Sequence, residues 1–381
     1  MDETEADRVS PQAQVPLFDL GRAAKRIENE LAQRWAQILE RTAFIGGDEV
    51  KEFERAFAGF QEVEECIAVA NGTDALVLAL RALGVGPGDE VIVPAFTFIA
   101  TAEAVSLVGA TPVFADVEPN GLNLDFGGAA ARLSERTVGV IGVHLYGNPF
   151  DVEAAADLCR EKGLWLIEDA AQAHGARWRD TPVGGFGRLA TWSFYPSKNL
   201  GCFGDGGAVT TREPELAARV RLLANHGATA RYHHGIVGTN SRLDGLQAAV
   251  LNCRLALLAG DNARRGAIAA RYRAYLVEAR GLEALPEPVA ALSAWHQFTV
   301  RSPRRDALQA FLAARGIGSA THYPEALHQQ PAFADLGVPP VLPVAEEAAA
   351  EVLCLPMFAE LTDAEVETVG LALAEFGAIG G

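Results

Sequence analysis

The sequence predicts an α/β protein in which a largely parallel sheet carries helices on both of its faces. Residues 138–144 form an apolar run, 152–162 have the spacing of an amphipathic helix, and 164–167 are apolar again. Asp151 is suited to begin that helix and Gly163 to end it. A strand, a helix and a second strand at this spacing indicate a βαβ unit with parallel strands. We therefore expect a sandwich of helices around the sheet.

Regular patterns continue on either side of this unit. We expect helices over 22–40, 49–60, 101–109, 213–224 and 241–258, and strands over 67–69, 90–94, 111–115, 190–195 and 208–211. Residues 225–240 are expected to form a loop. These elements assign 15–260 to one large domain. Residues 1–14 are polar and acidic without an apolar period, which is typical of a disordered tail.

The remaining residues, 261–381, predict a smaller α+β domain at the C-terminal end. Its expected elements are helices over 262–279, 306–315, 345–354 and 363–376, a strand over 295–301 and a second strand shortly before His322. We place the domain boundary near Gly260, because the glycine separates the helical pattern that ends at 258 from the one that begins at 262.

The composition restricts the possible partners. Acidic residues outnumber basic ones by 49 to 32, for a net charge of −17, which argues against nucleic-acid binding. A site for an anionic substrate would have to be locally basic. The five cysteines are scattered and lack metal-site spacing, which predicts reduced thiols in the cytoplasm. We expect no membrane partner, because no apolar run is long enough to span a bilayer and the acidic N-terminus is unlike a signal peptide.

A lysine between two strand-like runs is the first chemical signal. The apolar run 190–195 leads into Lys198, and a glycine-rich turn leads on into 208–211. A lysine at the mouth of a buried strand must have its charge solvated, paired or removed. An imine bond to an aldehyde cofactor would remove the charge. The alternative is a solvated lysine in a surface hairpin.

The second signal is an aspartate at the end of the preceding buried strand. Asp169 follows the run 164–167, at the strand end where open α/β sheets bind ligands. Taken alone, it could equally be a helix N-cap. Together, Asp169 and Lys198 are the two groups that pyridoxal phosphate requires of a protein. The lysine would form the Schiff base, and the aspartate would keep the pyridine nitrogen protonated.

A candidate phosphate seat lies earlier in the chain. The strand 67–69 passes through Asn71, Gly72 and Thr73 into a helix that extends to Leu83. Free N–H groups and the dipole at a helix start attract phosphate. Gly72 would allow a close approach of the backbone, and Thr73 would add a hydroxyl. An ordinary helix cap is the alternative.

Several motifs together resemble the pyridoxal-phosphate sugar aminotransferases of the DegT/DnrJ/StrS type. They are EDAAQ, SFYPSKNLG, GDGGAV, ANGTDAL, NSRLDGLQAAVL and HYPEALHQQPAF. The resemblance covers nearly the whole chain from Val15 onward. It implies fold type I, with a mostly parallel seven-stranded sheet, and amine transfer to a nucleotide-linked keto sugar. Some members of the wider group are dehydratases with a histidine in place of the lysine, so Lys198 favours amine transfer.

The resemblance also implies roles for single residues. Lys198 would carry the catalysis, assisted by the aspartate. The residues matched to cofactor contacts are Gly72, Thr73, Phe98, Asp169, Gln172, Ser193, Lys198 and Asn240. Phe98 would stack on the ring, Gln172 would lie over it, and Ser193 would bind the phosphate. Asn240 would reach the same phosphate in a neighbouring subunit, which implies a homodimer with shared sites.

Substrate contacts are expected from two places. The loop 225–240 carries basic and aromatic side chains, as an anionic substrate needs, and the motif HYP lies in the smaller domain. The candidates are Arg231, Tyr232, Arg242, His322 and Tyr323. The adjacent His233 and His234 would not share a face and have no further ligands at metal spacing, so we expect no metal.

The resemblance is greatest to enzymes that aminate C3 of a UDP-3-keto sugar, particularly the 3-keto N-acetylglucosaminuronate type, with glutamate as donor. A uronate carboxylate would need an arginine, such as Arg231 or Arg242. The alternatives are a dTDP-3-keto-6-deoxyhexose as substrate, an amino-acid aminotransferase with arginines for two carboxylates, and a regulator that binds the cofactor without catalysis. The product would be an amino sugar for polysaccharide, lipopolysaccharide or natural-product biosynthesis.

Overall fold

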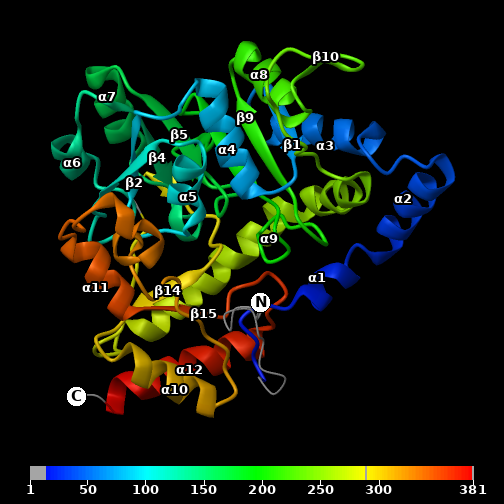
Figure 1. The fold of residues 1–381 in the computed structure, drawn as a ribbon. Coiled ribbons are helices and arrows are strands. Elements are labelled where there is room, and N and C mark those ends of the chain that lie inside the picture. Colours follow the sequence, from blue (N-terminus) through cyan, green and yellow to red (C-terminus); the bar gives the residue numbers. More distant parts are fainter. Residues whose placement is uncertain (1–13, 288–289, 380–381) are drawn as a thin grey trace.

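The computed structural model describes residues 14–287 and 290–379. The predicted tail, 1–14, lies outside the described residues except for its last member. Around the centre of the molecule runs a seven-stranded sheet in the order β1-β9-β8-β5-β4-β2-β3 (Figure 1). The strands are β1 (Glu65–Val69), β2 (Glu90–Pro94), β3 (Thr111–Ala115), β4 (Thr137–Val143), β5 (Trp165–Asp169), β8 (Leu189–Ser193) and β9 (Gly207–Thr211).

Only β9 of this sheet runs against its neighbours. It pairs antiparallel with β1 and with β8, whereas β3, β2, β4, β5 and β8 pair in parallel. The predicted fold class, a mostly parallel seven-stranded sheet, is confirmed. Because β4, β5 and β8 run in the same direction, their carboxyl ends meet at one edge, where open sheets bind ligands.

Side chains along each strand alternate between two apolar cores. In β1, Ile67 and Val69 pack into one buried cluster, and Cys66 and Ala68 pack into another on the opposite face. This is the two-residue period of a strand that is covered on both sides. The helices that cover the first face are α4 (Gly72–Leu83), α5 (Ala100–Leu107) and α8 (Pro214–Ala224). The opposite face is covered by α2 (Glu28–Arg41), α3 (Gly47–Phe60), α7 (Val152–Lys162) and α9 (Gly245–Leu276).

Helix α7 has the ends that its sequence predicts. The Asp151 side chain accepts hydrogen bonds from the backbone N–H groups of Glu153 at 3.0 Å and Ala154 at 2.9 Å. Gly163 takes the left-handed conformation, with φ of 68°, at the C-terminal end. Both are common helix-terminating devices, so the βαβ unit formed by β4, α7 and β5 follows directly from local signals.

The C-terminal part forms a second, smaller unit with its own apolar core. Its three-stranded sheet consists of β12 (Glu283–Ala284), β14 (Phe298–Arg301) and β15 (Val352–Leu355) and shares this core with α10 (Arg305–Ala314) and α12 (Asp363–Ile379). Helix α11 (Pro343–Glu351) contacts β14 but buries its alanines in the core of the larger sheet. The predicted helix over 345–354 is wrong in its last residues, because the apolar segment after Glu351 is a buried strand. In place of the predicted strand before His322 there are isolated bridges, from Ile317 to Val15 and from Ala320 to Cys354.

A second correction concerns the helices around Gly260. Instead of two helices, α9 is one continuous helix through this glycine, which is exposed. A glycine inside a helix costs only about 1 kcal/mol, and α9 packs against α2, α3 and α12 along its length. That packing outweighs the local signal for a break. The domain boundary near Gly260 stays a prediction.

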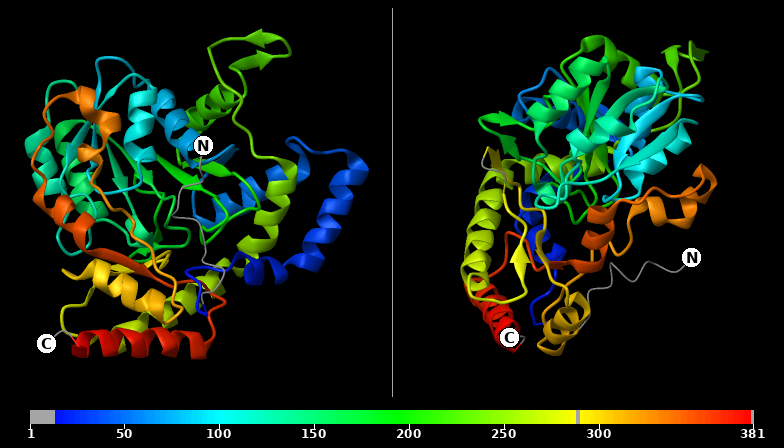
Figure 2. Two further views of the ribbon diagram at one scale, coloured as in Figure 1. Left: turned by 60° about the horizontal axis from the view of Figure 1, so that its bottom comes forward. Right: turned by 90° about the vertical axis from the view of Figure 1, so that its left-hand side faces the viewer.

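Two segments stand away from the body of the molecule. The predicted loop 225–240 carries a small hairpin of β10 (Ala228–Ala230) and β11 (His233–His234), which projects in both Figure 1 and Figure 2. The predicted helix over 22–40 is divided into α1 (Leu20–Lys25) and α2, and α2 extends to one side. The other short elements are α6 (Phe126–Ala129), β6 (Arg177–Trp178), β7 (Thr181–Pro182) and β13 (Ala291–Leu292). Of the helices described, none has both the length and the apolar character required to traverse a membrane.

Candidate active site

The two residues predicted to handle the cofactor lie at the carboxyl edge of the sheet. Asp169 is the last residue of β5 and pairs with Thr191 of β8. Lys198 follows the end of β8 by five residues, in a turn held by a 2.8 Å hydrogen bond from its own N–H to the Tyr195 carbonyl. Each group lies close enough to affect the pKa of the other. The pairing of β5 with β8 therefore brings both to one place.

Asp169 is buried, with 6% of its surface exposed. Its Oδ2 accepts a hydrogen bond from the hydroxyl of Thr101 at 2.8 Å, and its Oδ1 accepts one from the N–H of Ala171 at 3.2 Å. Burial raises the pKa of the carboxyl group, and the bond from Thr101 opposes that rise. A carboxylate in this setting gains stability from a cationic partner.

Lys198 is half-buried. Burial lowers the pKa of its amine to about 8, although attraction to Asp169 acts in the opposite direction. An amine with this pKa is partly neutral near physiological pH, which suits both nucleophilic attack and proton transfer. The lowered pKa distinguishes this lysine from the solvated surface lysine of the alternative interpretation.

The start of α4 and the end of β8 form a tight cradle. The side chain of Asn71 caps the helix by accepting a 2.8 Å hydrogen bond from the N–H of Asp74. A Cβ at Gly72 would lie 2.7 Å from the Cβ of Ser193, so glycine is required there. The first amides of a helix have no acceptor within it. Since Gly72 packs directly against Ser193, with 3.2 Å between a Cβ built at Gly72 and the Ser193 hydroxyl, this helix start is where a phosphate seat is expected.

Gln172 connects the large domain to the HYP motif. Its Oε1 accepts a 2.6 Å hydrogen bond from the N–H of Tyr146, and its Nε2 donates to the hydroxyl of Tyr323 at 3.3 Å. The rings of Phe98 and Tyr323 lie 6.0 Å apart, and Phe98 is 53% exposed. Phe96 is buried, as expected for a core residue.

His322 lies beside Tyr323 and is bound to Gln297, the residue directly before β14. Its Nδ1 is 3.0 Å from Nε2 of Gln297, and its carbonyl accepts a hydrogen bond from the Tyr146 hydroxyl. Residues from five separate stretches of the chain therefore converge on one site. They are Gly72, Thr73, Phe98, Asp169, Gln172, Ser193, Lys198, His322 and Tyr323.

The remaining predicted residues lie elsewhere within this chain. Arg231 and Tyr232 are exposed at the hairpin tip, where the guanidinium carbon is 5.2 Å from the centre of the tyrosine ring. Asn240 and Arg242, both exposed, lie at the base of the hairpin, next to Asn225. Within the described parts of the chain, the contacts of these four residues are with one another and with Asn225, and not with Lys198 or its neighbours. Their roles stay predictions, as does the neighbouring subunit that Asn240 would serve.

The sequence did not reveal several residues that contact Asp169 or the neighbour of Lys198 and thereby support the site. Thr101 was assigned only to a helix, yet its hydroxyl contacts Asp169. Asn199 and His296 bond to each other next to Lys198. The position of Asn199 directly after the lysine was a usable signal for a supporting role, whereas Thr101 and His296 carried none. No group of three or more potential metal ligands is formed by the residues that the structure describes.

The fold and the site define a class: an α/β enzyme with a buried aspartate and an activated lysine at the edge of a parallel sheet. The residues fit pyridoxal phosphate, since the Gly72 cradle can take a phosphate and Asp169 a cationic ring nitrogen. Residues 25–374 match the model of the DegT/DnrJ/EryC1/StrS aminotransferase family, and the chain belongs to that family. It is a pyridoxal-phosphate-dependent sugar aminotransferase, so the predicted family, enzyme class and cofactor are confirmed.

Three known proteins illustrate the similarity. The chain is 47% identical over 347 residues to a dTDP-3-amino-3,4,6-trideoxy-alpha-D-glucose transaminase of Streptomyces venezuelae, covering 90% of this chain and 91% of the relative. It is 44% identical over 361 residues to a UDP-N-acetyl-3-dehydro-alpha-D-glucosamine 3-aminotransferase of Acidithiobacillus ferrooxidans, covering 94% and 97%. The crystal structure of S. venezuelae DesV with a ketimine intermediate superposes with a TM-score of 0.94 at 45% identity, covering 96% and 99%. Nucleotide-sugar transamination is thus the activity of this group of relatives.

Proposed function

We propose that the enzyme transfers an amino group from glutamate to C3 of a keto sugar carried on a pyrimidine nucleoside diphosphate. The observation that carries this proposal is that two relatives at 44% and 47% identity, each matched over nine-tenths of the chain, are named for amination at C3. The sequence motifs favour a UDP-3-keto sugar. A dTDP-3-keto-6-deoxyhexose is the second candidate, because the relative at 47% identity is named for a dTDP sugar.

In this proposal each residue of the cluster has one task toward the cofactor. The amides of Gly72 and Thr73 and the hydroxyl of Ser193 hold its phosphate, and the ring lies between Phe98 and Gln172. Asp169 faces the ring nitrogen and favours its protonated state, because the buried carboxylate gains a cationic partner. When bound, pyridoxal phosphate supplies an aldehyde for the amino group and a ring that accepts the electron pair released at carbon.

Lys198 moves the protons of the reaction. Its neutral amine would remove the proton from Cα of glutamate and deliver it to the C4′ carbon of the cofactor. Hydrolysis would then release 2-oxoglutarate and leave the amino group on the cofactor. In the second half, the same amine delivers a proton to C3 of the sugar while the amino group is transferred. A pKa of about 8 allows both the neutral and the charged amine to be populated near neutral pH.

Substrate recognition would combine two surfaces. Tyr323 bonds to Gln172, with His322 next to it in the chain, and both would contact the sugar. Arg231, Tyr232 and Arg242 belong to the projecting hairpin, a basic and aromatic element in a protein of net charge −17. In a homodimer, the hairpin of one subunit would reach the site of the other, where its charge would attract the diphosphate.

The experiment is a substrate panel with the purified, cofactor-loaded enzyme. UDP- and dTDP-linked 3-keto and 4-keto sugars are generated in situ, and the amino sugar and 2-oxoglutarate are measured with glutamate as donor. We expect product from a 3-keto sugar only, and none from Lys198→Ala. Equal turnover of 2-oxo acids without a nucleotide would instead support an amino-acid aminotransferase. If the amino sugar forms with another amino donor but not with glutamate, only the assignment of glutamate as donor is wrong.

Shared sites have their own test. Mixed dimers of Lys198→Ala and Asn240→Ala subunits would contain one intact site if Asn240 acts across the interface. If the subunits mix at random, about half of the dimers are mixed, and each of these has one of its two sites intact. We then expect at most about a quarter of wild-type activity from the mixture and none from either parent dimer. If the mixture stays inactive, sharing through Asn240 is wrong. The proposal also places the enzyme in the cytoplasm, in line with the free state of its buried cysteines.

A further inference from the structure

The residue after the catalytic lysine is anchored more firmly than the lysine itself. Asn199 is buried, with 4% of its surface exposed. Its Nδ2 donates to Oδ1 of Asn262 at 2.9 Å and to the carbonyl of Ala294 at 2.7 Å. Its Oδ1 lies 3.1 Å from Nδ1 of His296. Both hydrogens of the amide and one lone pair of its oxygen are therefore in use.

These bonds settle the proton positions on His296. Because the amide nitrogen of Asn199 serves two acceptors, its oxygen must accept, and Nδ1 of His296 must carry the hydrogen. Burial, followed by the charges of Lys198 and Arg265, holds the pKa of His296 well below its usual range. The imidazole is consequently neutral. Its one ring N–H hydrogen is on Nδ1 and is directed at Asn199, and Nε2 carries no hydrogen.

The segment 293–297 that carries His296 is itself held in place from two sides. Arg265 of α9 donates to the carbonyls of Trp295 at 3.1 Å and His296 at 3.3 Å. Asn262, one helical turn earlier, bonds to Asn199 and to the carbonyl of His174. One face of α9 therefore holds both partners of the Asn199–His296 bond.

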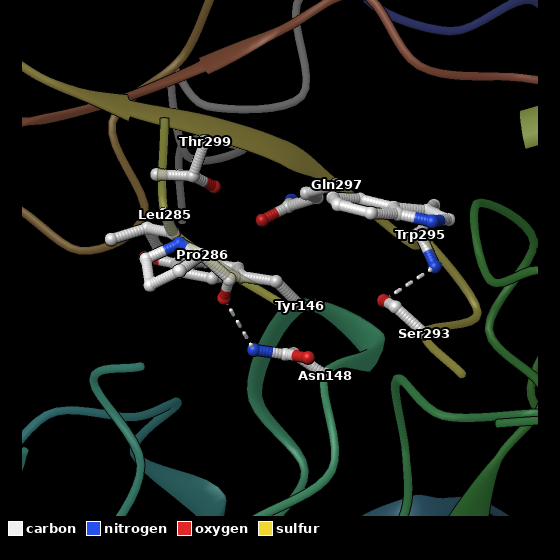
Figure 3. Close-up of a pocket in the computed structure, with 8 residues that line it drawn as sticks. All are labelled: Tyr146, Asn148, Leu285, Pro286, Ser293, Trp295, Gln297 and Thr299. Atoms are coloured by element: carbon white, nitrogen blue, oxygen red, sulfur yellow. Dashed lines mark hydrogen bonds between the residues drawn. The ribbon is translucent and has the colours of Figure 1, made fainter. Parts of the chain in front are cut away.

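On its other side, the segment meets the turn that supports Gln172. The N–H of Ala294 donates to the Gly147 carbonyl at 2.9 Å, and the N–H of Gln297 to the Tyr146 carbonyl at 3.3 Å. A Cβ at Gly147 would lie 3.0 Å from the nitrogen of His296, so only glycine allows this approach. Figure 3 shows Ser293, Trp295 and Gln297 arranged around the small cavity next to this turn.

We propose that His296 and Asn199 are positioning residues, which fix the Lys198 amine at the angle needed for its attachment to the cofactor. The small domain then contributes to the chemistry of the large one, through a bond between residues 97 positions apart. The same segment touches the predicted sugar contact at its far end, because Gln297 bonds to His322. This role of His296 and Asn199 rests on the proposed attachment of the cofactor to Lys198 and does not depend on which nucleotide sugar is the substrate.

The test uses cofactor-free full-length protein and two ligands. Pyridoxal phosphate attaches covalently to Lys198, which is followed by visible absorbance and by peptide mapping after borohydride reduction. Pyridoxamine phosphate occupies the same seat without any bond to lysine, so its dissociation constant reports the integrity of the seat. We expect His296→Leu to slow attachment of pyridoxal phosphate about tenfold or more while the affinity for pyridoxamine phosphate changes less than about threefold.

Three further variants make the result specific. In His296→Asn, the new Nδ2 can donate to Asn199 in place of Nδ1, so attachment should return to within about threefold of wild type. His328→Leu is the matched control, because His328 is also a buried histidine, bonded to Glu346 at 3.2 Å in another cluster. It should attach the cofactor at the wild-type rate. In the double variant Asn199→Ala/His296→Leu, the loss should not exceed that of the worse single variant.

The proposal is overturned if His296→Leu attaches the cofactor as fast as wild type. It is equally overturned if the affinity for pyridoxamine phosphate falls in parallel with the attachment rate, since His296 would then support the seat as a whole. Neither readout involves glutamate or a sugar, so these outcomes are independent of the substrate panel.

Discussion

The hydroxyl of Thr101, at the start of α5, donates a 2.8 Å hydrogen bond to the carboxylate of Asp169, at the end of β5. Both groups are buried. The bond favours the ionised form of a carboxyl group whose pKa burial otherwise raises. In the proposed site an ionised Asp169 would pair with a protonated ring nitrogen, so we expect Thr101 to keep the carboxylate ready for the cofactor.

Replacing Thr101 with valine should therefore weaken cofactor binding. Valine preserves the shape but removes the donor, and a hydrogen bond to a charged group contributes about 1.5–3 kcal/mol, or roughly 10- to 150-fold in affinity. Fluorescence titration of cofactor-free protein with pyridoxamine phosphate measures the change. Thr101→Ser retains the hydroxyl and should bind nearly as wild type. Equal affinity of the valine and serine variants would mean that the bond is unimportant.

Substitution of Gly72 by alanine should damage the phosphate seat. The added Cβ would lie 2.7 Å from the Cβ of Ser193, so α4 and β8 must separate at the point where the phosphate is expected. We expect the affinity for pyridoxal phosphate to fall by at least about tenfold. Gly86→Ala is the control, because nothing lies within 4 Å of a Cβ built at that glycine. A Gly72→Ala protein that retains cofactor through dialysis like Gly86→Ala would contradict this assignment.

The buried amine of Lys198 should make the stability of the cofactor-free protein depend on pH. Its pKa is about 8 in the folded state and about 10.4 in an unfolded chain. Between these values the unfolded state binds more protons, so stability rises with pH in this window and the destabilisation is complete below it. Lys198→Met should consequently be more stable than wild type at pH 7, by about 1–3 kcal/mol.

Urea unfolding at pH 7 and near pH 10.5 measures this difference, which should shrink at the higher pH because the amine is then neutral in the folded state and about half neutral in the unfolded chain. The exposed Lys162, at the end of α7, provides the control substitution Lys162→Met. A Lys198→Met protein whose advantage is the same at both pH values would show that packing, and not the amine charge, is responsible.

A fourth prediction concerns the continuous helix α9. Gly260 is exposed, and a Cβ added there meets nothing within 4 Å. Gly260→Ala should raise the free energy of unfolding by about 0.5–1 kcal/mol, because alanine loses less backbone entropy in a helix. Gly260→Pro should lower it by about 2 kcal/mol, because proline costs about 3 kcal/mol and glycine about 1 kcal/mol relative to alanine. Thermal unfolding of the cofactor-loaded enzyme compares the variants. If Gly260→Pro leaves the free energy of unfolding unchanged, the helix is broken at this point, as the sequence predicts.

Local signals explain why much of the architecture was predictable. The alternating core of β1, the cap at Asp151 and the terminating Gly163 each depend on residues a few positions apart. The failures have the same origin. Gly260 resembles a helix break only as long as the neighbours of α9 are unknown, and the segment after Glu351 has no local feature that distinguishes a helical end from a strand.

The amino-acid sequence by itself determined the order of strands and helices along the chain and the family to which the chain belongs. It also singled out Lys198 and Asp169 as the two candidate catalytic residues. These follow from spacing and from motifs that are continuous in the chain. Only the tertiary structure decided which side chains support them: Thr101 lies 68 positions from Asp169, and His296 lies 97 positions from Asn199. Contacts over such separations depend on how the strands pair and how α9 packs, which no short stretch of sequence specifies.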